Sequence, residues 1–197
     1  MTFSDFVTLT NQNPRAVLLL EGTREPLHVH ASSLTALATR LGTALPAARF
    51  RSGNAPGSDE LFLRGLDAVM ERVELVTPHE GHRSSATQAR IQPLGRASPQ
   101  TLKELVRLSI AATPRYRDLF ERYLTDNLPP ELKAKARYLL RDTLKVHGCP
   151  QAGLAPASGA LLYLNPADPD LGGTGHTRRV CTLLAVQVWP QQQWLAW

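Results

Sequence analysis

The fold is decided by the stretch RAVLLLEGTREPLHVHASSLTALATRLGTALPAARFRSG, which runs from Arg15 to Gly53. It opens with an apolar run that ends in a glycine turn, over Arg15–Gly22, as is typical of a buried strand. Apolar residues then recur at helical spacing over His30–Leu45, where a Ser pair is placed to cap the helix. A second short strand is predicted over Ala48–Gly53. Strand, helix and strand in this order indicate two parallel strands joined by a crossover.

The alternation continues on the carboxyl side of this stretch. The sequence predicts a helix over Asp59–Met70, a strand over Arg72–Pro78 and, much later, a strand over Ala157–Asn165. The glycine-rich segment GGTGHTRRVCTLLA then predicts a turn that leads into a helix, and VQVWP predicts a last short strand. Alternating strands and helices of these lengths predict an α/β fold, a Rossmann-like open parallel sheet flanked by helices.

A run of helices interrupts this pattern from about residue 98 to residue 147. The first helix opens on Ser98 with a proline at its first position, two further segments also begin at prolines, and Gly148 is placed to end the run. The segment QPLGRASPQ before the run is predicted to be an exposed connection. We therefore predict one domain over residues 1–197 that carries a helical insert over about 98–147, with a homodimer left open.

The positive charge of the chain is concentrated in this insert. The formal net charge is +5, and the segment from Arg96 to Lys145 holds eleven Lys or Arg against six Asp or Glu. An excess of this kind favours anionic partners. Two interpretations stay open, a set of solvated helical faces and a surface that binds nucleic acid or an acidic partner.

Several classes of protein are excluded by the sequence as given. Its longest clean apolar run, Ala16–Leu20, is too short to span a bilayer, and the first residues lack the basic start and long apolar segment of a secretory signal. We therefore expect a cytoplasmic protein with no membrane partner. Two cysteines, Cys149 and Cys181, make no disulfide framework and are expected to be small buried residues.

Four loops follow strands and lie at the edge of the sheet where ligands gather in parallel α/β folds. They are EGTREP, SGNAPGSDE, TPHEGHR and NPADPDLGGTGHT, and two of them are glycine-rich and lead directly into a helix. Such a loop offers free backbone N–H groups and the positive end of a helix dipole to an anion. The predicted ligand-binding residues are Gly22, Thr23, Arg24, Gly53, Asn54, Gly57, Ser58, Asp59, Gly172, Gly173, Thr174, Gly175, His176 and Thr177. For Asp59, capping of the next helix is an alternative role.

Three of these loops carry a family resemblance. EGTR, SGNAPGSDELF and GGTGHTRRV, in this order after successive strands, resemble the ligand loops of the SLOG superfamily of Rossmann-like domains, which includes the DNA-processing protein Smf and the Lonely Guy cytokinin-activating hydrolases. The resemblance covers roughly residues 15–83 and 157–189. It implies that the loops surround a nucleotide or a related phosphorylated sugar, and that no further cofactor is required.

The sequence departs from the hydrolases of that superfamily at the last loop. His176 stands where those enzymes have a threonine, and Arg178 and Arg179 stand where they have acidic residues, one of which assists cleavage of the N-glycosidic bond. We therefore predict a module that binds or senses a nucleotide, with no catalytic residue assigned. The first alternative is a nucleotide N-glycosidic hydrolase that takes its carboxylate from Glu21 or Glu80. The second is a nucleic-acid-binding protein related to Smf.

Other polar and aromatic residues receive structural roles. The loop PHEGHR does not have the spacing of a helical zinc motif, so we expect no metal there, although general acid–base use stays open. The histidines before the second predicted element and the tryptophans near the end of the chain are expected to serve structure and packing. These residues are His79, Glu80, His82, Arg83, His28, His30, Trp189, Trp194 and Trp197.

Overall fold

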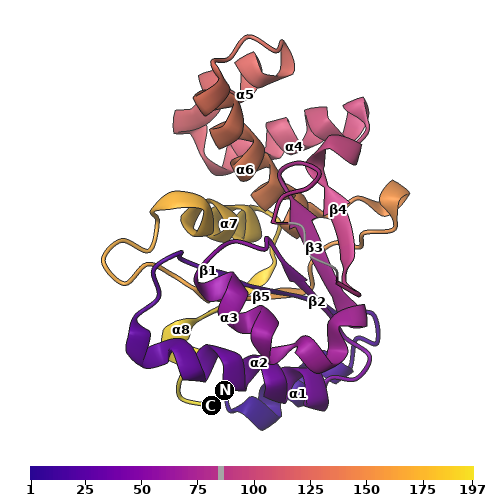
Figure 1. Cartoon of the computed structure of the whole chain (residues 1–197), viewed down its shortest axis with the longest axis vertical. Coiled ribbons are helices and arrows are strands. Elements are labelled where there is room, and N and C mark those ends of the chain that lie inside the picture. The colour runs from indigo at the N-terminus through magenta and orange to yellow at the C-terminus, as the bar shows by residue number, and fades with distance from the viewer. Residues whose placement is uncertain (84–86) are drawn as a thin grey trace.

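A computed structural model of the chain describes residues 1–83 and 87–197 (Figure 1). Within these residues, six strands form one fully parallel sheet in the order β4-β3-β2-β1-β5-β6. The strands are β1 Val17–Gly22, β2 Arg49–Ser52, β3 Val73–Thr77, β4 Arg90–Pro93, β5 Gly159–Tyr163 and β6 Gln187–Pro190. The predicted Rossmann-like α/β fold is therefore confirmed.

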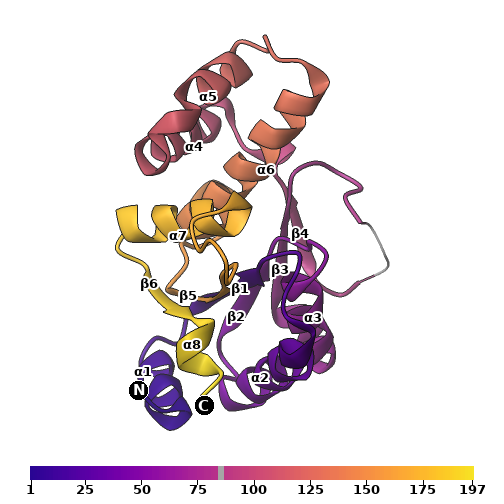
Figure 2. The same ribbon diagram turned by 90° about the vertical axis from the view of Figure 1, so that its left-hand side faces the viewer.

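Helices cover both faces of the sheet (Figure 2). The α-helices are α1 Phe3–Asn11, α2 Ala31–Ala44, α3 Ser58–Gly65, α4 Pro99–Ala112, α5 Arg117–Leu124, α6 Pro130–His147, α7 Gly172–Leu183 and α8 Gln191–Trp194. Short 3-10 helices are η1 His28–His30, η2 Asp67–Arg72, η3 Leu94–Arg96, η4 Pro114–Tyr116 and η5 Pro150–Ala152. One face of the sheet packs on α1, α2, α3 and α8, and the other face packs on α6 and α7. No helix of the described residues has the length and apolar character needed to cross a bilayer.

Side-chain alternation along β1 builds two cores. Leu18 and Leu20 point to the face covered by α1, α2, α3 and α8, where the aromatic side chains of Trp189 and Trp194 are also buried. Leu19 points to the other face and packs with residues of α6 and α7. Because successive residues of a strand face opposite sides, an apolar run such as this one is buried on both. The packing role predicted for the tryptophans is confirmed.

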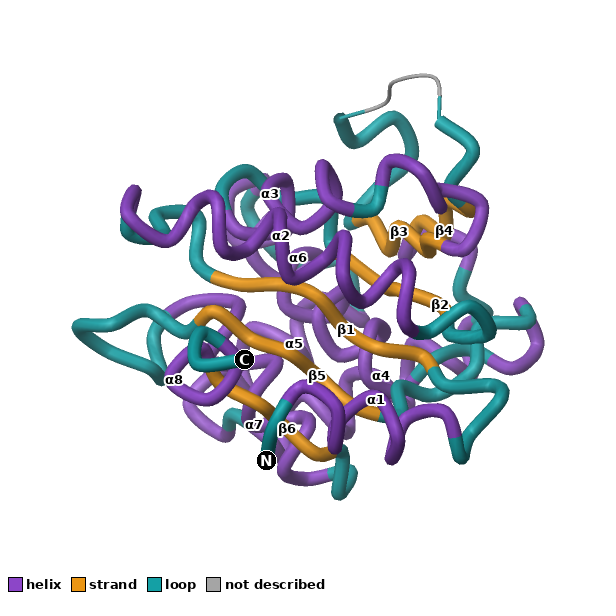
Figure 3. The backbone as a smooth tube through the Cα atoms, turned by 90° about the horizontal axis from the view of Figure 1, so that it is seen from below, coloured by secondary structure: helices purple, strands orange, loops and turns teal. Residues whose placement is uncertain are grey.

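The order of the strands reverses at β1, which lies between β2 and β5 (Figure 3). The chain adds β2, β3 and β4 on one side of β1, and then crosses back to add β5 and β6 on the other side. The helices α4, α5 and α6 belong to this crossover. In open parallel sheets, ligands bind at the carboxyl edge next to such a reversal.

The predicted helical run is present, and its last helix is an integral part of the layer that covers the sheet. Ser98 caps α4 by accepting a hydrogen bond from the backbone N–H of Thr101 at 3.1 Å, and Gly148, with φ of 73°, follows the last residue of α6. In the second half of α6, Leu139–Val146 is buried. The run therefore projects from the molecule at α4 and α5, while α6 returns to the sheet (Figure 1).

Some local predictions were wrong. The predicted connection QPLGRASPQ begins inside β4, an edge strand of four residues that is too short to show a pattern in the sequence. The helix α2 has no side-chain cap, because it begins at Ala31 and the Ser pair lies inside it. The glycines of GGTGHT form the first turn of α7 and not a turn before it. The helices α1 and α8 had not been predicted. Both cysteines are buried, as expected.

Candidate functional site

A cavity of about 460 Å³ lies at the carboxyl end of β1, between α6 and the first turn of α7. Its size is within the range of small-molecule sites, about 300–1,000 Å³. The residues around it come from the ends of β1 and β5, the loop into α3, the insert helices and the start of α7. They are Glu21, Gly22, Thr23, Arg24, Glu25, Ala55, Asp59, Tyr116, Lys135, Tyr138, Leu139, Arg141, Asp142, Lys145, Asn165, Leu171, Gly172, Gly173 and Thr174.

Half of the predicted ligand-binding residues line this cavity. They are Gly22, Thr23, Arg24, Asp59, Gly172, Gly173 and Thr174. The others lie outside the lining, and they are Gly53, Asn54, Gly57, Ser58, Gly175, His176 and Thr177. The structure therefore brings the first and last predicted loops together, as expected for loops that follow neighbouring strands.

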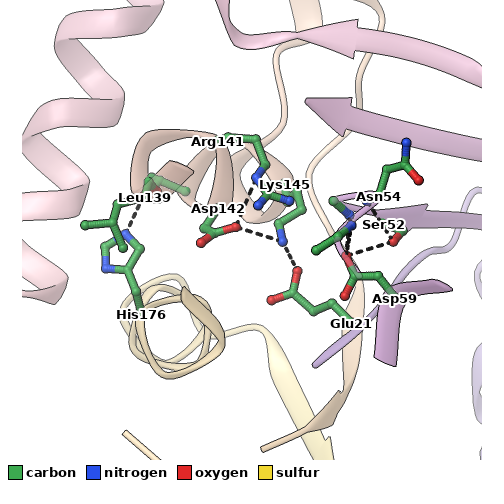
Figure 4. A network of polar contacts seen from close by, with 12 residues as sticks. Glu21, Ser52, Asn54, Asp59, Leu139, Arg141, Asp142, Lys145 and His176 are labelled. Atoms are coloured by element: carbon green, nitrogen blue, oxygen red, sulfur yellow. Dashed lines mark hydrogen bonds and ion pairs between the residues drawn. The ribbon is translucent and has the colours of Figure 1, made fainter. Parts of the chain in front are cut away.

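The glycine-rich loop after β2 is occupied by a side chain of the protein itself. Asp59, which is 2% exposed, accepts hydrogen bonds from the backbone N–H groups of Gly22 at 3.1 Å, Gly53 at 3.0 Å and Ala55 at 3.3 Å. The hydroxyl of Ser52 donates a fourth hydrogen bond at 3.1 Å. The backbone donors that sequence analysis assigned to a ligand at this loop are therefore satisfied by an internal carboxylate (Figure 4).

Two further residues of this loop pack it against the loop after β1. The Ser58 hydroxyl donates to the carbonyl oxygen of Thr23 at 2.8 Å, and the Ser58 backbone N–H donates to the same oxygen at 3.1 Å. Gly57 has φ of 84°, and a Cβ on it would lie 2.3 Å from the carbonyl oxygen of Arg24. Both residues hold the two loops together and lie outside the cavity lining. The loop after β2 can approach the loop after β1 because Gly57 has no side chain.

A buried network of charged side chains forms the floor of the cavity (Figure 4). The Lys145 ammonium donates a hydrogen bond to Glu21 Oε2 and forms an ion pair with Asp142 Oδ1 at 2.9 Å. The Nε of Arg141 lies 3.3 Å from the same oxygen of Asp142. The side chains of all four residues are at most 5% exposed. Buried charges of this kind are retained in proteins when they are paired.

The pKa values of the two buried acids, Glu21 and Asp142, are shifted in opposite directions. Burial raises the pKa of Glu21, against the opposing effect of Lys145. Burial also acts to raise the pKa of Asp142, but the charges of Arg141 and Lys145 outweigh it and lower this pKa below its usual value. Burial acts to lower the pKa of Lys145, and the carboxylates of Asp142 and Glu21 overcome it and raise this pKa. Asp142 and Lys145 are therefore held as an ion pair.

The charged residues of α6 were missed as site residues. Arg141, Asp142 and Lys145 had been counted with the surface charge of the insert, whereas the structure buries all three. The stretch YLLRDTLKV does carry a signal, because its three charges stand at helical spacing among apolar residues. A charge on the apolar side of a helix requires a partner, which in this protein is supplied by the floor of the cavity.

A second buried ion pair holds α6 on the sheet. Arg51 of β2 is fully buried and pairs with Glu74 of β3 at 2.6 Å. The same guanidinium donates to the carbonyl oxygen of Lys145 at 2.7 Å and to that of Ala155 at 2.7 Å. These bonds tie the carboxyl end of α6 to the sheet, and they position the side chain of Lys145 at the end of β1.

Arg141 and the first turn of α7 both border the cavity, and Arg141 Nη1 lies against Gly53. Arg141 Nη1 has no hydrogen-bond partner within the described part of the chain. The N-cap residue of α7, Leu171, makes no side-chain cap, and Gly172, Gly173 and Thr174 of the first turn line the cavity. The first N–H groups of a helix have no partner inside the helix. The helix end favours an anion, and the Asp142 carboxylate lies beside it, because a Cβ on Gly173 would be 2.7 Å from Asp142 Oδ2.

His176 lies away from the cavity, contrary to its predicted place. Its Nδ1 is 2.8 Å from the hydroxyl of Thr113 and its Nε2 is 3.0 Å from the hydroxyl of Thr143, and the side chain is fully buried. Burial lowers the pKa of His176 to about 4. Because α7 begins at Gly172, this residue comes a full turn into the helix and faces α4 and α6. It joins three helices and has no ring nitrogen left for a ligand.

The arginines after His176 also lie outside the cavity lining. Arg179 donates to the hydroxyl of Thr113 at 3.1 Å and to the carbonyl oxygen of Asp170 at 3.1 Å. Arg178 lies 3.8 Å from the carboxylate of Asp170. These contacts secure the loop before α7.

The histidines of the loop after β3 are outside the cavity as well. His79 and His82 pack edge to face at 5.3 Å, and Glu80 pairs with Arg96 at 2.9 Å. Of the two acids considered for a hydrolase, Glu21 therefore lines the cavity and Glu80 does not. Among the described residues, no group of three or more His, Cys, Asp or Glu side chains is placed to hold a metal ion.

Aromatic and basic side chains alternate at the mouth of the cavity. The guanidinium carbon of Arg24 lies 5.6 Å from the ring centre of Tyr138, and the ammonium of Lys135 lies 4.5 Å from that of Tyr116. Arg24 and Lys135 are exposed. The mouth therefore offers π-faces and exposed positive charges to an anionic ligand.

Comparisons with known proteins add a likeness of fold. No family model matches the chain, and no curated protein matches it. Among solved structures, it is similar to DNA processing protein A from Helicobacter pylori, described for its unique single-stranded DNA binding mode. The TM-score is 0.46 and the identity 14%, over 93% of this chain and 67% of that chain.

Proposed function

We propose that the cavity at the end of β1 binds a nucleotide or a nucleotide-derived phosphate ligand, as a module of the SLOG type. The observation that carries the proposal is the position of Arg141. Its side chain is 5% exposed and lines the cavity, and its Nη1, which lies against Gly53, has no hydrogen-bond partner among the described residues. An unsatisfied buried guanidinium is costly, and a phosphate oxygen satisfies it with a charge-assisted hydrogen bond.

The start of α7 borders the same cavity and also supports a phosphate there. Gly172, Gly173 and Thr174 border the cavity at the uncapped end of a helix of 12 residues. Free N–H groups and the helix dipole add about 0.3–1 kcal/mol for each negative charge, and up to roughly 2 kcal/mol in partly buried geometries. Together with Arg141, these contributions supply part of the about 8 kcal/mol that micromolar affinity needs.

The aromatic mouth supports a nucleotide over a bare sugar phosphate. Tyr116 and Tyr138 border the cavity on the side of the insert. Stacking of a base on an aromatic side chain is worth about 1–3 kcal/mol. A nucleotide therefore gains from both ends of the cavity, whereas ribose 5-phosphate gains from the phosphate end alone.

Thermal unfolding with added ligand tests this function. AMP at 100 times its Kd should stabilise the protein by about 2.7 kcal/mol, and each kcal/mol raises Tm by about 2–4 °C in a chain of this size. Arg141→Ala should weaken AMP binding by about ten-fold to a hundred-fold, since a hydrogen bond to a charged group contributes about 1.5–3 kcal/mol. Arg137→Ala, on the same helix but outside the lining, is the matched control. Binding of AMP by the Arg141 variant with wild-type affinity would contradict the proposal.

A second candidate is the binding of single-stranded nucleic acid at the mouth of the same cavity. It is favoured by Arg24, Arg115 and Lys135, which are exposed and lie against Tyr138 or Tyr116. Much of the remaining basic surface of the insert is engaged, since Arg107, Arg117, Arg122 and Lys133 form ion pairs. Fluorescence anisotropy with a labelled oligothymidine tests this candidate. This candidate is supported if the logarithm of the binding constant falls linearly with the logarithm of the salt concentration. The absence of binding at low salt would contradict it.

A further inference from the structure

The hydroxyl of Tyr163 is not needed for the packing of its ring. Tyr163, the last residue of β5, is fully buried on the face of the sheet covered by α1, α2, α3 and α8, with its ring centre 6.1 Å from that of Trp194. A phenylalanine ring would fill the same space. A buried tyrosine hydroxyl still requires a hydrogen-bond partner, and this one has its partners in the loop after β1.

Tyr163 holds the loop after β1 at two points. Its carbonyl oxygen accepts a hydrogen bond from the backbone N–H of Thr23 at 2.9 Å. Its hydroxyl accepts a hydrogen bond from the backbone N–H of Leu27 at 3.2 Å and lies 2.7 Å from Nδ1 of His30. One buried residue therefore fixes the loop where it leaves the sheet and again where it approaches α2.

Only three residues, Arg24, Glu25 and Pro26, lie between the two anchored N–H groups. The ring of the proline fixes its own φ and also restricts the residue before it. The backbone N–H of Glu25 donates to the Thr23 hydroxyl at 3.3 Å, which tightens the turn. Few conformations of so short a segment are compatible with both anchors. The anchors therefore determine where Arg24 and Glu25, which line the cavity, are placed.

This segment reaches the insert at the mouth of the cavity. The guanidinium carbon of Arg24 lies 5.6 Å from the ring centre of Tyr138 in α6, and the guanidinium carbon of Arg141 lies at the same distance from that ring. An exposed contact between a cation and an aromatic ring is weak. It forms at this mouth because the loop already holds Arg24 in place. Tyr163 does not line the cavity, so it acts on the mouth through Arg24.

We infer that Tyr163 is a positioning residue that holds the segment 23–27 as a strap at the mouth of the cavity, with Arg24 closed onto Tyr138. The strap exists without a ligand. For its effect on binding, the inference rests on the proposed function, and it assigns control of the mouth of that site to a residue of β5 outside the cavity.

Limited digestion with trypsin tests the strap without any ligand. Trypsin cleaves after Arg24 only when the loop leaves its folded path, so Tyr163→Phe, which keeps the ring and removes the hydroxyl, should be cleaved there about ten-fold faster than the wild type. Cleavage after Arg96, which is exposed at the end of η3, should change by less than about two-fold, as should both rates in Tyr123→Phe on α5. A wild-type rate at Arg24 in Tyr163→Phe, or an equal rise at both sites, overturns the inference.

Calorimetry with AMP tests whether Tyr163 acts through Arg24. Tyr163→Phe should weaken AMP binding by about three-fold to ten-fold in the wild-type protein, but by less than about 1.5-fold in Arg24→Ala, where no guanidinium is left to position. Equal weakening in both proteins would show a general effect on the fold and overturns the inference. If the wild type does not bind AMP, the proposed function fails, and the digestion alone decides whether the strap exists.

Discussion

The guanidinium of Arg141 occupies the space that a side chain on Gly53 would need, since Arg141 Nη1 lies 1.5 Å from the position of a Cβ at Gly53. Gly53 had been predicted to approach a ligand. The structure gives a different reason for this glycine, because its missing side chain lets an arginine of α6 lie against the end of β2. In this way, a loop of the sheet and a helix of the insert together position the proposed phosphate-binding group.

We predict that Gly53→Ala displaces Arg141. The added methyl group overlaps with Nη1, and overpacking of a buried site costs about 1–3 kcal/mol. The free energy of unfolding should fall by this amount, and AMP binding should weaken as it does in Arg141→Ala. Urea denaturation and calorimetry measure the two effects.

Gly95→Ala is the matched control for that prediction, because a Cβ on Gly95 would have no neighbour within 4 Å. It should change neither stability nor binding appreciably. Wild-type AMP affinity in Gly53→Ala would show that Arg141 does not need this space.

We predict that Glu21 and Lys145 are strongly coupled in stability. Their side chains are 3% exposed, and removing one member of a buried pair costs about 3–5 kcal/mol because the other charge is left unpaired. Lys145→Met should therefore be more destabilising than the double variant Glu21→Gln with Lys145→Met. A double-mutant cycle from urea denaturation measures the coupling. Additive effects of the two substitutions would contradict it.

We predict that His176 makes stability fall in weak acid. Its pKa is lowered by burial from 6.5 to about 4, so between these values the unfolded chain binds more protons than the folded one. Stability is therefore full above about pH 6.5 and declines as the pH falls towards 4, by roughly 3 kcal/mol in total.

The pH dependence of wild-type unfolding is compared with that of His176→Gln to check this. In His176→Gln, the free energy of unfolding should no longer fall in this way between pH 6.5 and pH 4. In His28→Gln, which changes an exposed histidine, it should still fall. An unchanged slope in His176→Gln would assign the pH dependence to other groups.

We predict that AMP survives incubation with the protein. The carboxyl groups on the floor of the cavity are engaged, Glu21 with Lys145 and Asp142 with both Lys145 and Arg141. The helix α7, whose first turn borders the cavity, carries no acidic residue that could take this role. Chromatography for free adenine measures the outcome. Adenine release that stops in Glu21→Gln would instead support the hydrolase and assign the acid.

The parts of the fold that could be predicted are those with a local cause. The strands β1, β3 and β5 are rich in apolar residues, α4 has a Ser cap followed by proline, and α6 ends at a glycine with positive φ. The strand β4 was missed because its four residues are ordered by pairing with β3, which no local pattern reveals. The start of α7 was misplaced because glycines there signal a turn, although packing makes them helical.

The sequence by itself determined a parallel α/β fold and placed several candidate loops at the carboxyl edge of the sheet, because periodicity and strand-to-helix order are local properties. The tertiary structure alone decided what those loops contact. It filled the loop after β2 with Asp59, turned His176 into a contact between helices and brought Arg141 to the end of β2. The physical reason is that a buried polar group must find a partner, and that partner is set by the crossing of elements far apart in the chain.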